Sequence, residues 1–266
     1  MNMNNFQDKV VWVSGASSGI GEGIVRKLAA LGAKIVLSSR NIESLEIIRS
    51  SLPNSDQHFC LALDLEKSSN FPELAGIVVD KMGRIDYLFN NGGLSQRSEA
   101  GDTPMSIDRR IMEINYFGNI ALSKAVLPYF KNQKSGHIVV ISSIAGKFGF
   151  FLRSAYSASK HALHGFYESL LLEEEKNNIK VTIACPGKIN TNISVNALNS
   201  DGGKHGIMDH NQETGMSVEE CVNKLLRAVE SNQKEILIGN KEIKAVTLKR
   251  FFPSIFWKII KKQSAT

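Results

Sequence analysis

Tyr156 and Lys160 stand four residues apart, and this pair is the pattern in the chain that most clearly indicates chemistry. A phenol has an unperturbed pKa of about 10, so it is a poor acid or base at neutral pH. Residues i and i+4 share one face of a helix, and an ammonium group beside a phenol favours the phenolate. We therefore expect Lys160 to lower the pKa of Tyr156 and make it a group that exchanges a proton with a bound molecule.

A serine pair, Ser142-Ser143, follows the apolar run Ile138-Val139-Val140-Ile141 upstream of this tyrosine. A serine at the carboxyl end of a strand can direct its hydroxyl into the crevice faced by the following helix. Tyrosine as acid or base and Ser143 as hydrogen-bond donor to an oxyanion predict a proton-transfer site for a carbonyl or a secondary alcohol. Tyr-x-x-x-Lys alone also fits a half-buried tyrosine beside a solvated lysine. The surrounding sequence must therefore decide between this interpretation and a proton-transfer site.

A glycine-rich turn near the amino terminus provides that context. The apolar run at 10–13 leads into Ser14-Gly15-Ala16-Ser17-Ser18-Gly19-Ile20-Gly21 and then into a segment with helical periodicity. Small residues let the backbone approach a pyrophosphate, and the helix amino terminus presents N–H groups to it. The spacing is not Gly-x-Gly-x-x-Gly, and a simple tight connection is the alternative. Its position between a strand and a helix favours a dinucleotide site.

The residue after the second predicted strand indicates which dinucleotide is bound. An acidic side chain there would bind the ribose 2′-OH of NAD, but the chain has Arg40. A guanidinium group pairs well with a 2′-phosphate. We expect NADP(H) in preference to NAD(H), the alternative being a solvated arginine at the start of a loop.

With these motifs together, the chain resembles the single-domain short-chain dehydrogenase/reductase family. Within it the chain is most similar to the hydroxysteroid-dehydrogenase-like branch that includes dehydrogenase/reductase member 7. Two departures are Ser14, where threonine is commoner, and Gly92, where alanine is usual. The resemblance covers nearly the whole chain and rests on Ser14 to Gly21, Asp64-Leu65, Asn90 to Gly93, Asn115, Ser143, Tyr156, Lys160, Pro186-Gly187 and Thr191.

The resemblance also implies roles for individual residues. The catalytic set would be Asn115, Ser143, Tyr156 and Lys160, with Asn115 holding a water linked to the lysine. A homodimer or homotetramer would form through the two long helices expected at 105–131 and 154–177. The cofactor would be bound by Gly15, Ser17, Ser18, Gly19, Ile20, Gly21, Arg40, Asp64, Leu65, Asn91, Gly92, Tyr156, Lys160, Pro186, Gly187, Ile189 and Thr191.

Strand-like and helical segments alternate along the chain, which predicts an α/β, single-domain Rossmann fold. Its doubly wound, seven-stranded parallel sheet would have helices on both faces. Strands are expected near 10–14, 34–39, 58–63, 86–89, 137–142, 180–184 and 235–238. Helices are expected near 20–31, 42–50, 68–82, 105–131, 154–177 and 217–231, and the long loop at 196–215 is expected to be a substrate lid.

Charge and composition exclude several functions. The six basic residues after position 242 account for the net charge of +6, so the body of the chain is neutral and no nucleic-acid site is expected. Cys60, Cys185 and Cys221 suit reduced intracellular thiols. For His161 and His164 we expect no acidic third ligand nearby, and so no metal site. No apolar run is long enough to span a membrane, and residues 1–9 are too short for a signal peptide; a cytoplasmic protein is expected.

The last residues differ from the rest, and we divide the chain into a Rossmann domain, 1–242, and a basic amphipathic tail, 243–266. In the tail, Ile255, Phe256, Ile259 and Ile260 would fall on one helical face and Lys258, Lys261 and Lys262 opposite. Such a segment can lie peripherally in an anionic membrane interface. The alternative is an apolar face packed on the protein itself.

These features predict an NADP(H)-dependent oxidoreductase that interconverts a small hydrophobic ketone or aldehyde and its alcohol. The apolar pocket would include Phe148, Phe150, Phe151 and Leu152, with Val195, Leu198, Ile207 and Met208 contributed by or beside the lid. Two alternatives stay open. One is a 3-oxoacyl thioester reductase of lipid synthesis, and the other is a cofactor-sensing protein without turnover.

Overall fold

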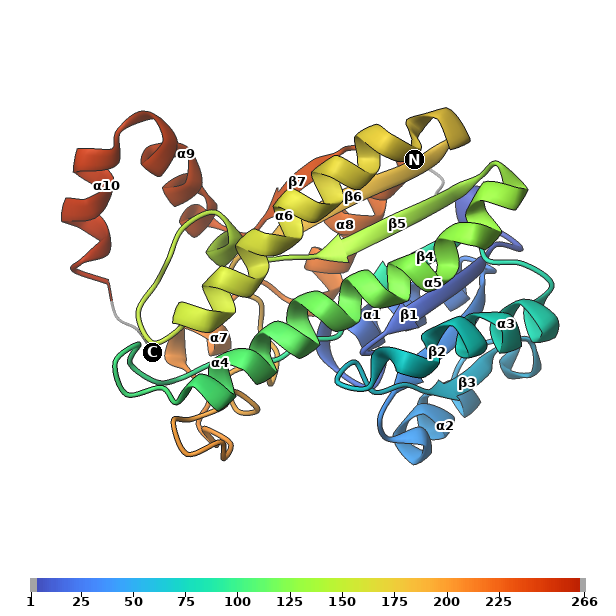
Figure 1. The fold of residues 1–266 in the computed structure, drawn as a ribbon, viewed down its shortest axis with the longest axis horizontal. Helices are drawn as coiled ribbons and strands as arrows, with labels where there is room; N and C mark the ends of the chain where they lie inside the picture. Colours follow the sequence, from blue (N-terminus) through green and yellow to red (C-terminus); the bar gives the residue numbers. More distant parts are fainter. Residues whose placement is uncertain (1–3, 264–266) are drawn as a thin grey trace.

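Seven parallel strands form one sheet in the order β3-β2-β1-β4-β5-β6-β7 (Figure 1). The computed structural model describes residues 4–263. The sheet confirms the predicted Rossmann architecture, and each strand lies within two residues of its expected position. The strands are β1 Val10–Ser14, β2 Lys34–Ser39, β3 Phe59–Ala62, β4 Tyr87–Asn90, β5 Gly136–Ile141, β6 Ile179–Pro186 and β7 Glu235–Ile238.

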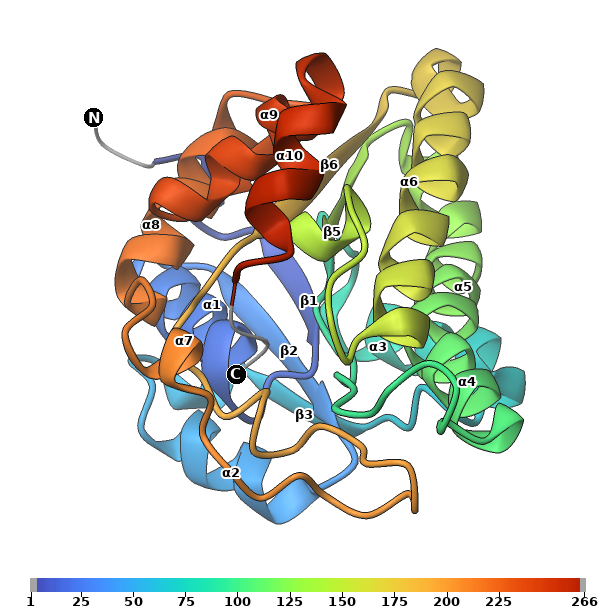
Figure 2. The same ribbon diagram turned by 90° about the vertical axis from the view of Figure 1, so that its left-hand side faces the viewer.

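Helices cover both faces of this sheet (Figure 2). One face packs against α1 Gly19–Ala30, α2 Ile42–Ser50 and α8 Val218–Glu230. The other packs against α3 Phe71–Met82, α5 Gly118–Gln133 and α6 Ser154–Glu174. Because both faces are covered, the central strands are apolar runs rather than alternating sequences, and every residue of β1 and β5 is buried.

The strand order reverses between β1 and β4, which are neighbours in the sheet but not in the sequence. In an open parallel sheet, ligands bind outside the carboxyl ends of the strands at such a reversal. The glycine-rich turn after β1, the turn after β4 and the serine pair after β5 all lie at this edge.

The single helix expected over 105–131 is wrong. A π-helical segment, Glu113–Phe117, separates α4 Met105–Met112 from α5. The side-chain amide of Asn119 donates hydrogen bonds to the backbone carbonyls of Ile114, at 3.1 Å, and Asn115, at 2.9 Å. These bonds take up carbonyls that a regular helix would use internally, and the turn widens around Asn115.

The tail forms two short helices, α9 Lys244–Phe251 and α10 Pro253–Ile260, which make a hairpin that stands off from the sheet (Figure 1). Of the expected apolar face, Phe256 alone is buried; its ring packs on Phe148 at 5.3 Å between centroids. Ile255 and Ile259 are each about half exposed. Within residues 4–263 no helix is long and apolar enough to cross a bilayer. The boundary at 242/243 stays a prediction.

The long loop before α8 is partly ordered by short elements. It contains α7 His210–Glu213, and Leu198 forms isolated β-bridges with Gln96 and Lys204. The Leu198 carbonyl accepts a hydrogen bond from the Arg97 backbone N–H at 2.8 Å. The expected lid is therefore fastened to the turn that follows β4.

Candidate active site

Tyr156 and Lys160 lie one turn apart on α6, and both are buried. The Lys160 ammonium lies 5.8 Å from the centre of the Tyr156 ring. Its Nζ donates a hydrogen bond to the carbonyl of Ile141, the last residue of β5, at 2.8 Å. The predicted i, i+4 pair is thus brought to the carboxyl edge of the sheet.

The protonation of this pair differs from the sequence prediction. Burial raises the pKa of Tyr156; a hydrogen bond with the Ser143 side chain and the positive charges of Arg153 and Arg97 only partly oppose this. Burial also lowers the pKa of Lys160, to about 8. The expected lowering of the Tyr156 pKa by Lys160 is therefore wrong for this structure: the opposing charges are those of the two arginines, and desolvation outweighs them. At neutral pH Tyr156 is a protonated phenol, which is the form that donates a proton.

Ser143 is held between the ends of two strands. Its Oγ accepts a hydrogen bond from the backbone N–H of Ala145 at 3.1 Å and donates one to the carbonyl of Pro186, the last residue of β6, at 3.3 Å. The hydroxyl is close enough to Tyr156 to affect the tyrosine's pKa. The two hydroxyl groups can therefore bind the same oxygen atom.

Asn115 lies in the π-helical segment and is fully buried. Its amide exchanges two hydrogen bonds with the backbone of Leu94, at 2.7 and 2.8 Å, and donates a third to Ser159 Oγ at 3.0 Å. A Cβ on Gly93 would lie 3.0 Å from Asn115 Oδ1 and 3.6 Å from Lys160 Nζ. Glycine at this position keeps the space between the asparagine and the lysine free.

One cavity of about 2010 Å³ contains most of the predicted site residues. Ser143, Tyr156 and Lys160 line it, as does every predicted cofactor residue except Gly21. Asn115 is not itself among the residues that line the cavity. Pockets for drug-sized ligands are usually about 300–1,000 Å³, so this cavity has room for a dinucleotide and a substrate together.

The glycine-rich turn fits a dinucleotide phosphate. Gly15 has a φ of +67°, and a Cβ there would lie 2.7 Å from Gly92 Cα. Ser18 is the N-cap residue of α1, but its side chain makes no capping hydrogen bond. The first N–H groups of a helix are unpaired unless something caps them, and here the turn that carries them lines the cavity.

Gly21 has a packing role that the sequence prediction missed. A Cβ at Gly21 would lie 2.1 Å from the Gly15 carbonyl oxygen and 2.5 Å from Asn91 Nδ2, so only glycine allows α1 to pack against the turn. Ser14 keeps the hydroxyl expected of threonine, and its Oγ accepts hydrogen bonds from the backbone N–H groups of Asn91 and Gly92, each at 3.2 Å.

Three further residues predicted to bind the cofactor lie at the cavity. Arg40 follows β2, is exposed and lines the cavity. Asp64 also lines it, and its carboxylate accepts a hydrogen bond from the backbone N–H of Glu66 at 3.1 Å. Thr191 approaches the glycine-rich turn, with its Cγ2 3.3 Å from the position of a Cβ on Gly19.

The apolar wall of the cavity contains only part of the predicted set. Phe148, Phe150 and Leu198 line the cavity. Phe151 and Ile207 are exposed, with 45% and 63% of their surface accessible. The tail adds further apolar residues to the wall, among them Leu248, Phe252, Ile259 and Ile260.

Gln96 is a residue of the site that the sequence analysis did not identify. It is fully buried, and its Oε1 accepts hydrogen bonds from the backbone N–H groups of Ala155, at 2.9 Å, and Tyr156, at 3.3 Å. Its Nε2 donates to Ser98, Thr103 and Ser154. Gln96 therefore caps the start of α6 beside Tyr156.

A buried ion cluster fastens the loop beside the same site. Asp209 Oδ2 accepts hydrogen bonds from Arg97 Nε and from an Arg153 terminal nitrogen, both at 2.9 Å. The two arginines line the cavity. The sequence contained no local signal for this cluster, because Asp209 lies 112 residues from Arg97 and 56 from Arg153.

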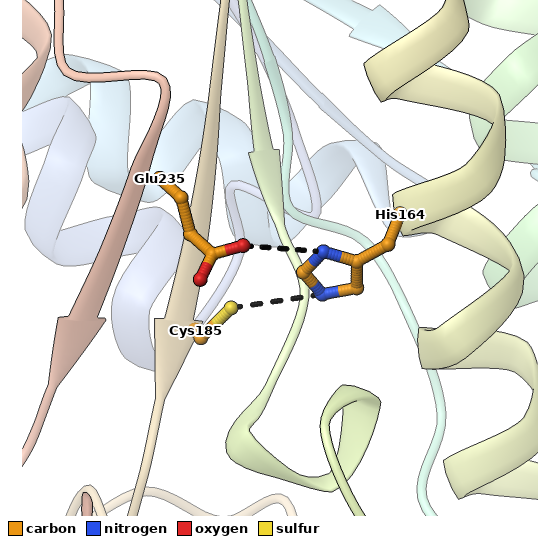
Figure 3. A group of neighbouring side chains, drawn as sticks. All are labelled: His164, Cys185 and Glu235. Carbon is orange, nitrogen blue, oxygen red and sulfur yellow. Dashed lines mark hydrogen bonds and ion pairs between the residues drawn. The ribbon is translucent and has the colours of Figure 1, made fainter. Parts of the chain in front are cut away.

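His164 lies in a second polar cluster behind the site, with Cys185 and Glu235 (Figure 3). The expectation that His164 has no acidic neighbour is wrong: Glu235 lies 3.6 Å and Glu168 3.7 Å from its Nδ1. The groups drawn are close enough to hold a metal ion. However, Cys185 and Glu235 approach opposite ring nitrogens, and the Lys147 ammonium contacts His164 Nδ1 at 3.1 Å and pairs with Glu235. The Lys147 ammonium group thus already neutralises the charge of the Glu235 carboxylate.

The three cysteines are buried free thiols, as expected. Burial raises the pKa of each to about 12. They are therefore protonated at neutral pH and unreactive as nucleophiles.

Comparison with solved structures places the fold. A short-chain dehydrogenase from Streptomyces avermitilis superposes with a TM-score of 0.82 at 26% identity, covering 98% of this chain and all of that one. A short-chain dehydrogenase from Burkholderia cenocepacia in complex with NADP has a TM-score of 0.81 at 22% identity, covering 97% and 99%. A short-chain dehydrogenase/reductase from Burkholderia phymatum in complex with NAD has a TM-score of 0.82 at 20% identity, covering 94% and 95%.

Sequence comparison gives the family. The family model for short chain dehydrogenases matches residues 9–202. Dehydrogenase/reductase SDR family member 7B from Mus musculus is 41% identical over 96% of this chain and 80% of its own length. Dehydrogenase/reductase SDR family protein 7-like from Anopheles gambiae is 39% identical over 99% of this chain and 85% of its own. The chain therefore belongs to the short-chain dehydrogenase family of oxidoreductases.

Proposed function

We propose that this protein is an NADP(H)-dependent oxidoreductase that interconverts a hydrophobic ketone or aldehyde and its alcohol, with Tyr156 as the proton donor or acceptor. The observation that carries the proposal is the placement of Ser143, Tyr156 and Lys160 in the wall of the cavity that the glycine-rich turn also lines. A carbonyl group at these side chains would lie in the same cavity as the cofactor.

The protein's own part in the reaction is orientation and proton transfer. When bound, the nicotinamide supplies or accepts the hydride. Tyr156 gives its phenolic proton to the substrate oxygen, and the Ser143 hydroxyl donates a hydrogen bond to the same oxygen. Lys160, with its pKa lowered to about 8, is able to give up a proton near neutral pH. It lies across Gly93 from Asn115, and together these residues would restore the proton of Tyr156.

The preference for NADP(H) is supported by charge. Arg40 lines the cavity, where its guanidinium group would pair with a 2′-phosphate, and the lining contains nine basic side chains against three acidic ones. A bound phosphate group is favoured where basic side chains outnumber acids. The solved relatives include complexes with either dinucleotide, so the argument for NADP(H) comes from this chain's own residues.

The substrate class is supported by the apolar part of the wall. Phe148, Phe150 and Leu198 come from the body of the protein, and Phe252, Ile259 and Ile260 come from the tail. Apolar walls with a few convergent polar groups are typical of sites for hydrophobic small molecules. The polar groups here are those of Ser143 and Tyr156.

The test is to replace Tyr156 by phenylalanine and to follow NADPH consumption with a panel of cyclic ketones, aldehydes and acetoacetyl thioesters. Loss of the proton donor should lower turnover by about 10²–10⁴-fold, while the dissociation constant for NADPH stays within twofold. Tyr129→Phe, which removes a hydroxyl outside the cavity lining, is the matched control and should keep wild-type turnover.

Near-wild-type turnover of Tyr156→Phe with NADPH bound would refute the catalytic assignment. A wild type that binds NADPH tightly and oxidises it with no member of the panel would support the cofactor-sensing alternative. A clear preference for the thioesters would favour the reductase of lipid synthesis.

A further inference from the structure

Large apolar side chains are unusually exposed on the α9–α10 hairpin. Phe251 and Phe252 have 64% and 57% of their surface accessible, and Ile255, Trp257 and Ile259 have 49%, 48% and 47%. These five residues fall within nine positions of the chain. Contiguous exposed apolar surface of this kind indicates a binding face.

The helical spacing gathers part of this surface on one side. Ile255 and Ile259 stand at i and i+4 and share one face of α10, and Phe252 directly precedes this helix. Phe256 lies beside them on the helix, but its ring packs on Phe148 and is buried. The hairpin is therefore attached to the body through Phe256, while Phe251, Ile255 and Trp257 are exposed and do not line the cavity.

The charge around this face has a single sign. Lys244, Lys249, Arg250, Lys258, Lys261 and Lys262 are the charged residues from position 243 onward, and no acidic residue accompanies them. Lys258, Lys261 and Lys262 are exposed. A helix with apolar and aromatic side chains on one side and lysines on its border can bury its apolar side chains at a bilayer surface and pair its lysines with anionic headgroups.

The same hairpin forms part of the cavity wall. Phe252 and Ile259 are both exposed at the surface and contribute to the cavity lining, together with Leu248 and Ile260. A surface on which the hairpin docked would therefore lie next to the cavity, and an apolar molecule could pass between the two without crossing much water.

We propose that the α9–α10 hairpin is a membrane-docking element that binds an anionic lipid surface and places the cavity beside the lipid. The protein would be peripheral to the membrane, held by the exposed side chains of residues 251–259 and by the lysines that border them. Docking rests on this surface alone and does not require the proposed catalytic function.

A lipid surface fits the face better than a second copy of this chain does. Two copies meeting through these hairpins would bring like charges together, since the segment has no acidic residue to pair with the lysines. An anionic surface complements the whole set of charges at once.

The experiment is co-sedimentation of the full chain with vesicles, in the absence of substrate. We expect binding to vesicles that contain phosphatidylserine, weak binding to pure phosphatidylcholine, and loss of binding as salt rises, because exposed charges are screened. The triple variant Lys258→Glu, Lys261→Glu, Lys262→Glu should bind at least about tenfold more weakly, since each lysine contributes to attraction by the anionic surface.

A matched triple variant elsewhere controls for net charge. Lys81, Lys180 and Lys234 are also exposed lysines but lie outside the tail, and their replacement by glutamate should leave most of the vesicle binding intact. Phe251→Ser with Ile255→Ser, at two exposed positions outside the cavity lining, should weaken binding at all salt concentrations. In each variant, retained NADPH binding and a cooperative thermal transition would show that the protein is folded.

Fluorescence gives a second, local readout. Trp12 is fully buried, whereas Trp257 is half exposed. Emission should shift to shorter wavelength when anionic vesicles are added, and Trp257→Phe should abolish that shift. Equal pelleting of the wild type and the tail triple variant would overturn the proposal. A change in oligomeric state in Phe251→Ser with Ile255→Ser, without a change in its vesicle binding, would also overturn it.

Discussion

Lys160 must fold into a site that disfavours its charge. Its pKa falls from 10.5 to about 8 because the ammonium is buried. Between these two values the unfolded chain binds a proton that the folded chain has released, so stability rises with pH in that interval. Below about pH 8 the charged amine is buried at a cost of up to about 3 kcal/mol, from about 1.4 kcal/mol per pKa unit.

We therefore expect Lys160→Met to unfold at higher urea concentration than the wild type at neutral pH. The difference should shrink about two pH units higher, where the wild-type lysine no longer holds its proton when folded. Urea denaturation of both proteins at the two pH values measures this difference in stability. A difference that stays constant with pH would show that burial of the charge is not its cause.

A separate prediction concerns Arg40 and the preference for NADPH over NADH. Arg40→Asp should reduce the ratio of kcat/KM with NADPH to that with NADH by about ten- to hundredfold, since a charged hydrogen bond contributes about 1.5–3 kcal/mol. Steady-state kinetics with both cofactors measures this ratio. Arg227→Asp, on the exposed side of α8, is the control and should leave it unchanged; equal use of both cofactors by the wild type would contradict the assignment.

At the scale of elements, the start of α6 depends on Gln96. Gln96→Ala removes the acceptor for the Ala155 and Tyr156 backbone N–H groups and the donor to three hydroxyls. Unpaired buried polar groups cost about 1–3 kcal/mol, so we expect a loss of that size in the free energy of unfolding.

Turnover should fall as well, because the first turn of α6 positions Tyr156. Gln57→Ala, at an exposed position, should change neither stability nor kcat. Urea denaturation and kcat measured on both variants test the prediction. A loss of stability with wild-type kcat would restrict Gln96 to a structural role.

The elements also show what the sequence could and could not predict. The seven strands were predictable because buried parallel strands are continuous apolar runs. Tyr156 and Lys160 were predictable because their spacing is local. The break at Asn115 was not, since it depends on where the Asn119 amide points. Asp209 was not, because its partners lie far away in the sequence and only folding brings them together.

At the scale of the whole molecule, we expect a homodimer or homotetramer that forms through α4, α5 and α6. Phe117, in the π-helical segment between α4 and α5, is 47% exposed, and Leu172 on α6 is 70% exposed. A shallow hollow between α4 and α6 is lined in part by Met105, Met112 and Ala158. Apolar residues exposed along neighbouring helices suit an interface between copies.

Light scattering should therefore report a dimer or tetramer at micromolar concentration. Phe117→Glu combined with Leu172→Glu should shift it toward monomer, because two charges would be buried without partners. Ile47→Glu is the control, since Ile47 is 73% exposed on α2, across the sheet. A monomeric wild type would contradict the expectation.

The contact between Phe148 and Phe256 has a consequence for how long the protein stays on a membrane. Phe148 lines the cavity, and Phe256 belongs to the hairpin proposed to dock. When one contact joins two binding surfaces, each ligand changes the affinity for the other by the same factor. If lipid docking strengthens substrate binding, a filled cavity prolongs residence at the lipid surface and product release shortens it. The rate at which the protein exchanges between membrane and solution would then follow the rate of turnover.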